Sequence, residues 1–136
     1  MKPFIRKRNI LIADTNFLIY AVINKIDLTQ LYDILEGAII IATTWKVKKE
    51  LERMAKRKTK EGTAAVIANK MELTVFKEKS RDADEEIINV AYGLKAKEEN
   101  EINVYLLTHD KKLIKKAKEK GINVILIKGK GKVDFL

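Results

Sequence analysis

Four acidic residues of this chain lie beside apolar segments, where a folded protein rarely leaves an unpaired charge. Asp14 directly follows the apolar run 10–13, and Asp110 follows the largely apolar run 104–108. Burying an unpaired carboxylate costs several kcal/mol, roughly, so each group requires a partner. Taken alone, Asp110 is typical of a helix N-cap before the lysine-rich segment that follows it. Taken together, two aspartates that end apolar strands indicate a ligand site.

The other two acids lie on helical segments. In the helix that begins at Trp45, a turn of about 100° per residue places Glu50 on the flank of the apolar stripe, whereas Glu52 points away. Asp84 lies on the N-terminal extension of an apolar helix face. The helix dipole also favours an acid there, so a purely structural role for Asp84 is the alternative. The two stripes consist of Val47, Leu51 and Met54, and of Ile87, Ile88, Ala91 and Leu94.

Carboxylate oxygens are the ligands that hard divalent cations prefer. The four inward-leaning acids therefore predict a site for Mg²⁺ or Mn²⁺. The neighbouring Asp82 and Glu85 have another explanation, because D-x-x-E is the spacing of a capping box with Asp82 as the helix N-cap.

Alternating strands and helices must position these acids. Short β-branched runs alternate with segments of helical period, which indicates right-handed βαβ units and a parallel sheet covered on both faces. Open α/β sheets bind ligands at the carboxyl ends of their strands. We expect one α/β domain over residues 1–136, with strands at 9–14, 39–43, 73–76, 104–108 and 123–127. The predicted helices are 16–23, 28–36, 45–58, 62–71, 84–99 and 111–120, and the tail KGKGKVDFL is predicted to have no element.

Composition restricts the class of protein. The 136 residues are 46% hydrophobic and 35% charged, which is typical of a globular chain. Because there is no cysteine, disulfides and thiolate metal sites are excluded. No apolar run reaches about 18 residues, and polar residues interrupt the apolar stretch near the start, so we expect a cytoplasmic protein without a membrane segment. The net charge of +9 favours nucleic acid, and lysines that merely maintain solubility are the alternative.

The motifs around the acids form a recognisable set. In chain order they are D-T-N (Asp14, Thr15, Asn16), E-L (Glu50, Leu51), D-x-x-I-x-x-x-A (Asp84, Ile87, Ala91) and T-x-D (Thr108, Asp110). Each motif is short, but their order and spacing resemble the PIN-domain ribonucleases over nearly the whole chain. Within that family the chain is most similar to an archaeal group related to the PIN nucleases of eukaryotic pre-ribosomal RNA processing.

This resemblance implies a three-layer α/β/α sandwich whose parallel sheet has the order 3-2-1-4-5. That order brings Asp14 and Asp110 together at the switch point between the first and fourth strands. It also implies an endoribonuclease that needs Mg²⁺ or Mn²⁺ and leaves a 5′-phosphate and a 3′-hydroxyl. Asp14 would be the central metal ligand, Asp84 and Asp110 would complete the shell, and Glu50 would bind a second ion or orient water.

Residues around the four acids receive lesser predicted roles. Asn16 and Thr108 are expected to fix the carboxylates by hydrogen bonds. Glu85 stands where some relatives carry a second aspartate, and we assign it at most an outer ligand position. His109, the only histidine, is interpreted as a bystander rather than a general base.

Substrate binding is predicted for the basic segment beside Glu50. Eight cations occur between positions 46 and 60, and a solvated lysine-rich helix face is the alternative. Single-stranded RNA is favoured over a duplex because an exposed backbone can bend into a small cleft. The predicted RNA contacts are Lys46, Lys49, Arg53, Lys56, Arg57 and Lys58, and Lys48 and Lys60 complete the eight.

Other functions stay open at this level. A toxin-type PIN ribonuclease held by an antitoxin protein would look nearly the same. A PIN-like RNA-binding module without catalysis should lack one or more acids, whereas this chain retains all four. A D-x-D phosphatase is disfavoured because Asn16 stands where its second aspartate must be. We therefore expect RNA as the partner and rRNA processing or RNA turnover as the role. A homodimer is compatible with this expectation.

Overall fold

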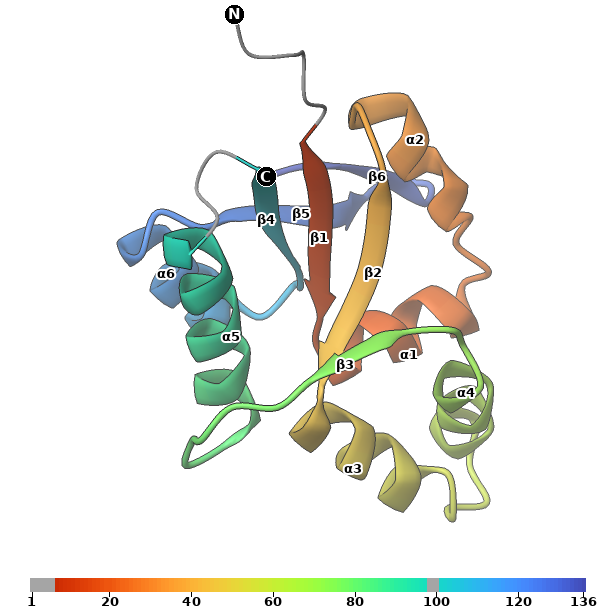
Figure 1. Cartoon of the computed structure of the whole chain (residues 1–136). Coiled ribbons are helices and arrows are strands. Elements are labelled where there is room, and N and C mark those ends of the chain that lie inside the picture. The colour runs from red at the N-terminus through yellow and green to blue at the C-terminus, as the bar shows by residue number, and fades with distance from the viewer. Residues whose placement is uncertain (1–6, 98–100) are drawn as a thin grey trace, which may run out of the picture.

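The computed structural model describes residues 7–97 and 101–136, which form a six-stranded sheet (Figure 1). The strand order is β3-β2-β1-β4-β5-β6; the first five strands in the chain are parallel, and β6 is antiparallel to β5. The predicted parallel order 3-2-1-4-5 is confirmed. The strands are β1 (Arg8–Ala13), β2 (Ile39–Thr44), β3 (Thr74–Phe76), β4 (Ile102–Leu107), β5 (Asn123–Lys128) and β6 (Lys132–Phe135).

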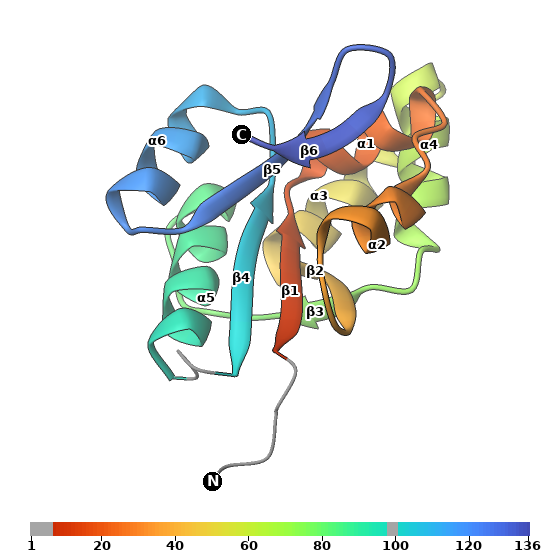
Figure 2. The same cartoon turned by 90° about the horizontal axis from the view of Figure 1, so that it is seen from above.

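Helices cover both faces of the sheet, so the predicted three-layer sandwich is also confirmed. α5 and α6 lie together on one side, whereas α1, α3 and α4 lie on the other (Figures 1 and 2). The reason is topological: the chain moves outward from β1 in one direction through β3 and in the other direction from β4 to β5, and right-handed crossovers then place their helices on opposite faces. The helices are α1 (Thr15–Ile23), the 3₁₀ turn η1 (Leu28–Gln30), α2 (Leu31–Ile34), α3 (Trp45–Met54), α4 (Lys60–Asn69), α5 (Ala83–Lys97) and α6 (Lys111–Glu119).

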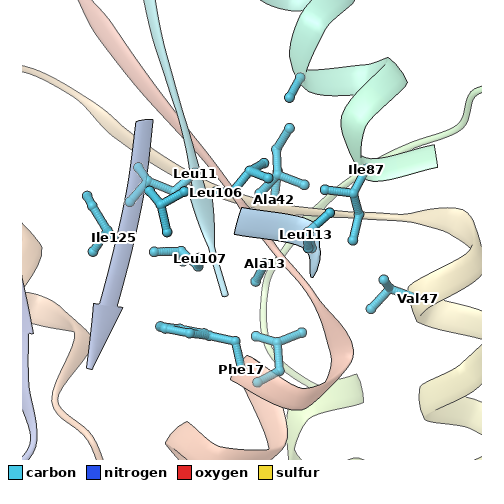
Figure 3. Packing of buried hydrophobic residues seen from close by; sticks show 14 of the residues in the cluster. Leu11, Ala13, Phe17, Ala42, Val47, Ile87, Leu106, Leu107, Leu113 and Ile125 are labelled. Carbon is cyan, nitrogen blue, oxygen red and sulfur yellow. The ribbon is translucent and has the colours of Figure 1, made fainter. Parts of the chain in front are cut away.

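The core is centred on β1 and β4. Residues 9–13 of β1 are all buried, as expected for a parallel strand that is covered on both faces. Figure 3 shows Leu11 and Leu106 of these strands near Ile125 of β5, with Phe17 of α1 below them. This packing fixes the ends of β1 and β4, and with them the backbone from which Asp14 and Asp110 project.

The predicted helix 45–58 is wrong at its C-terminal end. α3 ends at Met54, and α4 begins after an N-cap at Thr59, whose hydroxyl accepts a hydrogen bond from the Gly62 N–H at 3.0 Å. A side chain at Gly62 would place its Cβ 2.0 Å from the Arg57 carbonyl oxygen. The turn therefore depends on a glycine that allows two stretches of backbone to approach closely.

Two further differences concern short elements. The predicted helix 28–36 is divided into η1 and α2, and the tail contains the unpredicted strand β6. Gly131, with a φ of 80°, allows the turn before β6, and the Gln30 side chain accepts from the Val133 N–H and donates to the Gly131 carbonyl. The predicted helix end at Glu99 lies outside the described residues. None of the described helices is long and apolar enough to cross a membrane.

Candidate functional site

One pocket at the carboxyl ends of the central strands brings together the four acids that the sequence indicated. Asp14 follows β1 and Asp110 follows β4, and these strands are neighbours. Glu50 reaches the pocket from α3, and Asp84 reaches it from the first turn of α5. The pocket, called the acid pocket below, has a volume of about 150 Å³ and is also lined by Thr15, Asn16, Val47, Ala83 and Ile87.

Asp14 is held in the acid pocket by two hydrogen bonds. It is the N-cap of α1: its Oδ1 accepts from the Phe17 N–H at 2.7 Å, and its Oδ2 accepts from the Thr108 hydroxyl. The side chain is 7% exposed. Burial raises the pKa of Asp14 above its ordinary value, the two hydrogen bonds oppose this rise, and the charges of Asp110 and Asp84 add to it. The carboxylate is thus fixed in orientation but is electrostatically unfavourable.

Thr108 connects the two strand-end aspartates. Its hydroxyl donates to Asp14 and accepts from the backbone N–H of Asp110 at 3.0 Å. Asp110 in turn is the N-cap of α6 and accepts from the Leu113 N–H at 3.0 Å. The T-x-D motif therefore sets the geometry of both carboxylates through one hydroxyl group.

Asp84 experiences the same cluster of negative charges. Burial is the main reason that its pKa is raised, and the charges of Asp110, Asp82 and Glu50 add to the rise, whereas Lys116 opposes it. Because Asp110 raises the pKa of both Asp14 and Asp84, these carboxylates belong to one electrostatic site.

Glu50 is oriented by a neighbour that the sequence analysis did not select. The Thr15 hydroxyl donates to Glu50 Oε2 at 3.0 Å, and Thr15 itself is buried in the first turn of α1. Asn16, which was predicted to make such a bond, lines the pocket but is largely exposed. The D-T-N motif contained the signal for Thr15, but only the packing of α1 against α3 pairs it with Glu50.

A second, larger cavity adjoins the acid pocket. This basic groove has a volume of about 780 Å³ and shares Glu50 and Ala83 with the acid pocket. A polyanionic strand that lies in the groove would therefore pass directly beside the four carboxylates. Its remaining lining residues are Trp45, Lys46, Lys49, Glu52, Arg53, Lys56 and Asp82.

Comparison with known proteins gives the family. Residues 11–130 match the sequence model of a protein family that is described as a PIN-like domain. The chain belongs to this PIN-like domain family. Ribonuclease VapC4 of Methanocaldococcus jannaschii is 32% identical over 126 residues, which cover 88% of this chain and 91% of that protein. The solved PIN domain endonuclease Utp24 shares the fold, with a TM-score of 0.72, 24% identity, and coverage of 93% of this chain and 90% of that chain.

The predicted RNA-binding cations of this PIN domain fall into two groups. Lys46, Lys49, Arg53 and Lys56 line the basic groove, although the Lys46 ammonium group donates to the Ser80 carbonyl at 2.5 Å. The exposed Arg57 and Lys58 lie in the turn after α3, outside the groove lining. Lys48 donates to the Asn69 carbonyl at 2.9 Å and so joins α3 to α4.

The run of acids at the start of α5 has three different roles in the PIN domain. Asp82 accepts from the Glu85 N–H at 2.8 Å as a helix cap, and the Glu85 carboxylate accepts from Arg81 Nε at 2.6 Å. Glu85 thus pairs with Arg81 and does not line the acid pocket, and the outer ligand position considered for it stays an untested prediction. No sequence pattern indicated Glu86, which is 1% exposed and accepts from the backbone N–H groups of Lys46 and Glu78. Glu86 therefore anchors the start of α3 beside the groove.

His109 lies outside the acid pocket lining of this PIN domain. Its ring stacks on Phe17 at 5.5 Å between centroids and lies against Tyr20 at 5.3 Å. Its Nε2 accepts from the Ile127 N–H at 3.0 Å. These contacts join α1 to β5 and give His109 a packing role.

Proposed function

We propose that this PIN domain is a divalent-metal-dependent endoribonuclease that hydrolyses phosphodiester bonds in single-stranded RNA. The observation that carries the proposal is the acid pocket, in which four carboxylates from separate elements gather at one end of a basic groove. A structural acid cluster would pair its carboxylates with cations. Among the described residues, no ion pair forms to any of these four acids.

The donor set suits Mg²⁺ or Mn²⁺, because all four groups offer carboxylate oxygens. Within the described part of the chain, no three acidic or histidine side chains converge closely enough to form a ready-made cluster. The charge of Asp110 nevertheless adds to the raised pKa values of both Asp14 and Asp84, so these carboxylates are close enough to interact. Asp14, Asp84, Asp110 and Glu50 would hold the ion or ions. When bound, a divalent ion activates water and neutralises charge on the scissile phosphate.

The chain's own residues orient these groups. Thr108 and the Phe17 N–H fix both oxygens of Asp14, so its carboxylate enters the reaction without reorganising. Thr15 fixes Glu50, which lies on the boundary with the basic groove and is placed to orient the attacking water. Lys49, Arg53 and Lys56 hold the phosphates of the strand that leads to the pocket.

RNA is the substrate that the chemistry and the comparison favour together. The net charge of +9 attracts polyanions, and the relative with 32% identity is named a ribonuclease. The small volume of the acid pocket, about 150 Å³, favours a flexible single strand over a rigid duplex.

The test is a cleavage assay on mixed single-stranded RNAs in Mg²⁺, in Mn²⁺ and in EDTA. We expect internal cleavage in the metal ions, none in EDTA, and none with Asp110→Asn or Asp84→Asn. Glu85→Gln is the matched control, because its carboxylate binds Arg81 outside the pocket lining, and it should retain activity. Full activity in EDTA, or in both aspartate variants, would contradict the proposal. An inert parent protein would leave the alternative of a silent RNA-binding module.

Two cellular roles fit this chemistry: processing or turnover of RNA, including rRNA, and a toxin-type ribonuclease held by an antitoxin protein. A toxin-type enzyme should arrest growth when it is expressed alone, and a small protein encoded beside it should restore growth. A processing enzyme should instead cleave a defined precursor RNA and leave growth unaffected.

A further inference from the structure

The basic groove contains an aromatic side chain for which the proposed hydrolysis has no use. Trp45 is the only tryptophan of the chain, it is 39% exposed, and it lines the groove but not the acid pocket. Its backbone is anchored, because Trp45 is the first residue of α3 and follows Thr44, a fully buried N-cap. The exposed part of this anchored indole is available to a ligand.

Two lysines from different elements surround this indole. The Lys49 ammonium group lies 5.3 Å from the centroid of the Trp45 ring, and that of Lys77, which follows β3, lies 4.5 Å from it. Both distances are within the range of a cation–π contact. An apolar protein partner would have to desolvate these charges, whereas a nucleotide offers a base to the ring and phosphates to the lysines.

Trp45 begins a line of groove residues along α3. The line continues with Lys49, Arg53 and Lys56, named the cation stripe below, at spacings of four, four and three residues. Residues at such spacings share one face of a helix, although Lys56 lies just beyond the last helical residue. Lys46 and Glu50, which are four residues apart, form the neighbouring row of groove residues.

We propose that Trp45 is a stacking platform for one unpaired nucleobase of the RNA strand beside the acid pocket. The inference rests on the proposed function and adds the way in which the strand is held. The base stacks on the indole and displaces one ammonium group, which then contacts a phosphate, while the cation stripe follows the backbone away from the acids. Stacking places no demand on base identity, because every base has a π face.

The single tryptophan gives a direct binding assay. Asp110→Asn protein in EDTA is titrated with a short unstructured RNA and, separately, with an abasic strand of the same length and charge. We expect the RNA to quench the Trp45 fluorescence and the abasic strand to leave it nearly unchanged, although both strands bind. Equal quenching by the two strands would overturn the proposal.

Cleavage kinetics provide the second test. Trp45→Leu should raise the KM for RNA by about 5- to 150-fold, the effect expected for one lost base stack. The KM of Trp45→Phe should lie between those of Trp45→Leu and the parent. The matched control is Tyr92→Leu on α5, because Tyr92 is 50% exposed and also has a lysine over its ring, Lys120 at 5.1 Å, but lies outside the groove lining. That variant should keep the parent KM.

The two proposals fail in different ways. If the parent cleaves RNA and both Trp45 variants keep its KM, the platform is refuted and the endoribonuclease stands. If the parent neither cleaves nor binds RNA, both proposals are refuted. A KM that rises equally in the Trp45 and Tyr92 variants would show a general effect of losing surface aromatics and would also overturn the platform.

Discussion

Changing Asp14 to asparagine separates a metal-binding carboxylate from one that only holds the fold. Asp14 caps α1 through Oδ1 and accepts from Thr108 through Oδ2. Asparagine is as good an N-cap as aspartate, so the bond from the Phe17 N–H is kept. The change replaces one acceptor by an amide N–H and removes one negative charge from the acid pocket.

The two effects have opposite signs. Removing one charge from a partly buried carboxylate cluster gains on the order of 2 kcal/mol at an effective dielectric constant of about 20. Losing the Thr108 hydrogen bond costs about 1 kcal/mol. At pH 7 without metal, we therefore expect Asp14→Asn to raise the free energy of unfolding by on the order of 1 kcal/mol, or the Tm by roughly 4 °C.

The gain should depend on pH. The folded protein has a raised Asp14 pKa, so between the ordinary and the raised value it binds more protons than the unfolded chain. The parent protein therefore loses stability as pH rises through that window. The stabilisation that comes from protonated Asp14 is fully present only below the ordinary pKa. Because Asp14→Asn lacks this titration, its advantage over the parent should shrink when the pH falls below the ordinary pKa.

Asp14→Ala is the control for the capping role. Alanine loses the N-cap, worth about 1 kcal/mol, and leaves the buried Phe17 N–H and Thr108 hydroxyl without their acceptor. We expect it to be less stable than Asp14→Asn by roughly 2 kcal/mol.

Melting curves of the three proteins in EDTA and in Mn²⁺ decide between these roles. Mn²⁺ at about 100 times its Kd should stabilise the parent by about 2.7 kcal/mol, and both variants should lose most of this gain. If Asp14→Asn melts below the parent in EDTA at pH 7, Asp14 is primarily structural and the reasoning is refuted.

Changing the whole cation stripe to alanine should make the slope of log K against log salt for RNA binding shallower by roughly 0.7 per lost phosphate contact. The control is the double change Lys128→Ala and Lys130→Ala, which should keep the slope of the parent protein. Gly62→Ala should lower the free energy of unfolding by about 1–3 kcal/mol, because the new Cβ would lie 2.0 Å from a carbonyl oxygen. Gly93→Ala, whose new Cβ would meet no atom within 4 Å apart from its chain neighbours and its own helix backbone, should be neutral or stabilising in the same melting experiment. Thr15→Val should reduce kcat about 10-fold and leave the Tm nearly unchanged, because it frees Glu50 to rotate; an unchanged kcat would show that Thr15 does not position Glu50.

Local patterns in the sequence determined the layers of the fold and the two aspartates at its centre. β1 is apolar from Ile10 to Ala13 and β4 from Val104 to Leu107, because both faces of the sheet are covered there. A polar residue that follows such a run is visible without any structure. The caps at Asp82 and Asp110, which the sequence indicated, each accept from a backbone N–H three residues later, and Asp14 makes the same local bond although its capping role was not predicted. These features depend on contacts within a few residues, which periodicity and spacing report directly.

Only the tertiary structure decided which polar side chains meet. Thr15 reaches Glu50 across 35 residues, and Glu86 reaches the Lys46 N–H across 40, so neither contact leaves a local pattern. Glu85 and Glu86 are adjacent acids, yet one pairs with an exposed arginine and the other is buried beneath α3, because a turn of about 100° separates their directions. β6 was missed for a related reason: the lysines and glycines that lead into it resemble a loop. The strand is stabilised by pairing with β5 and by Gln30, which lies about a hundred residues earlier in the chain.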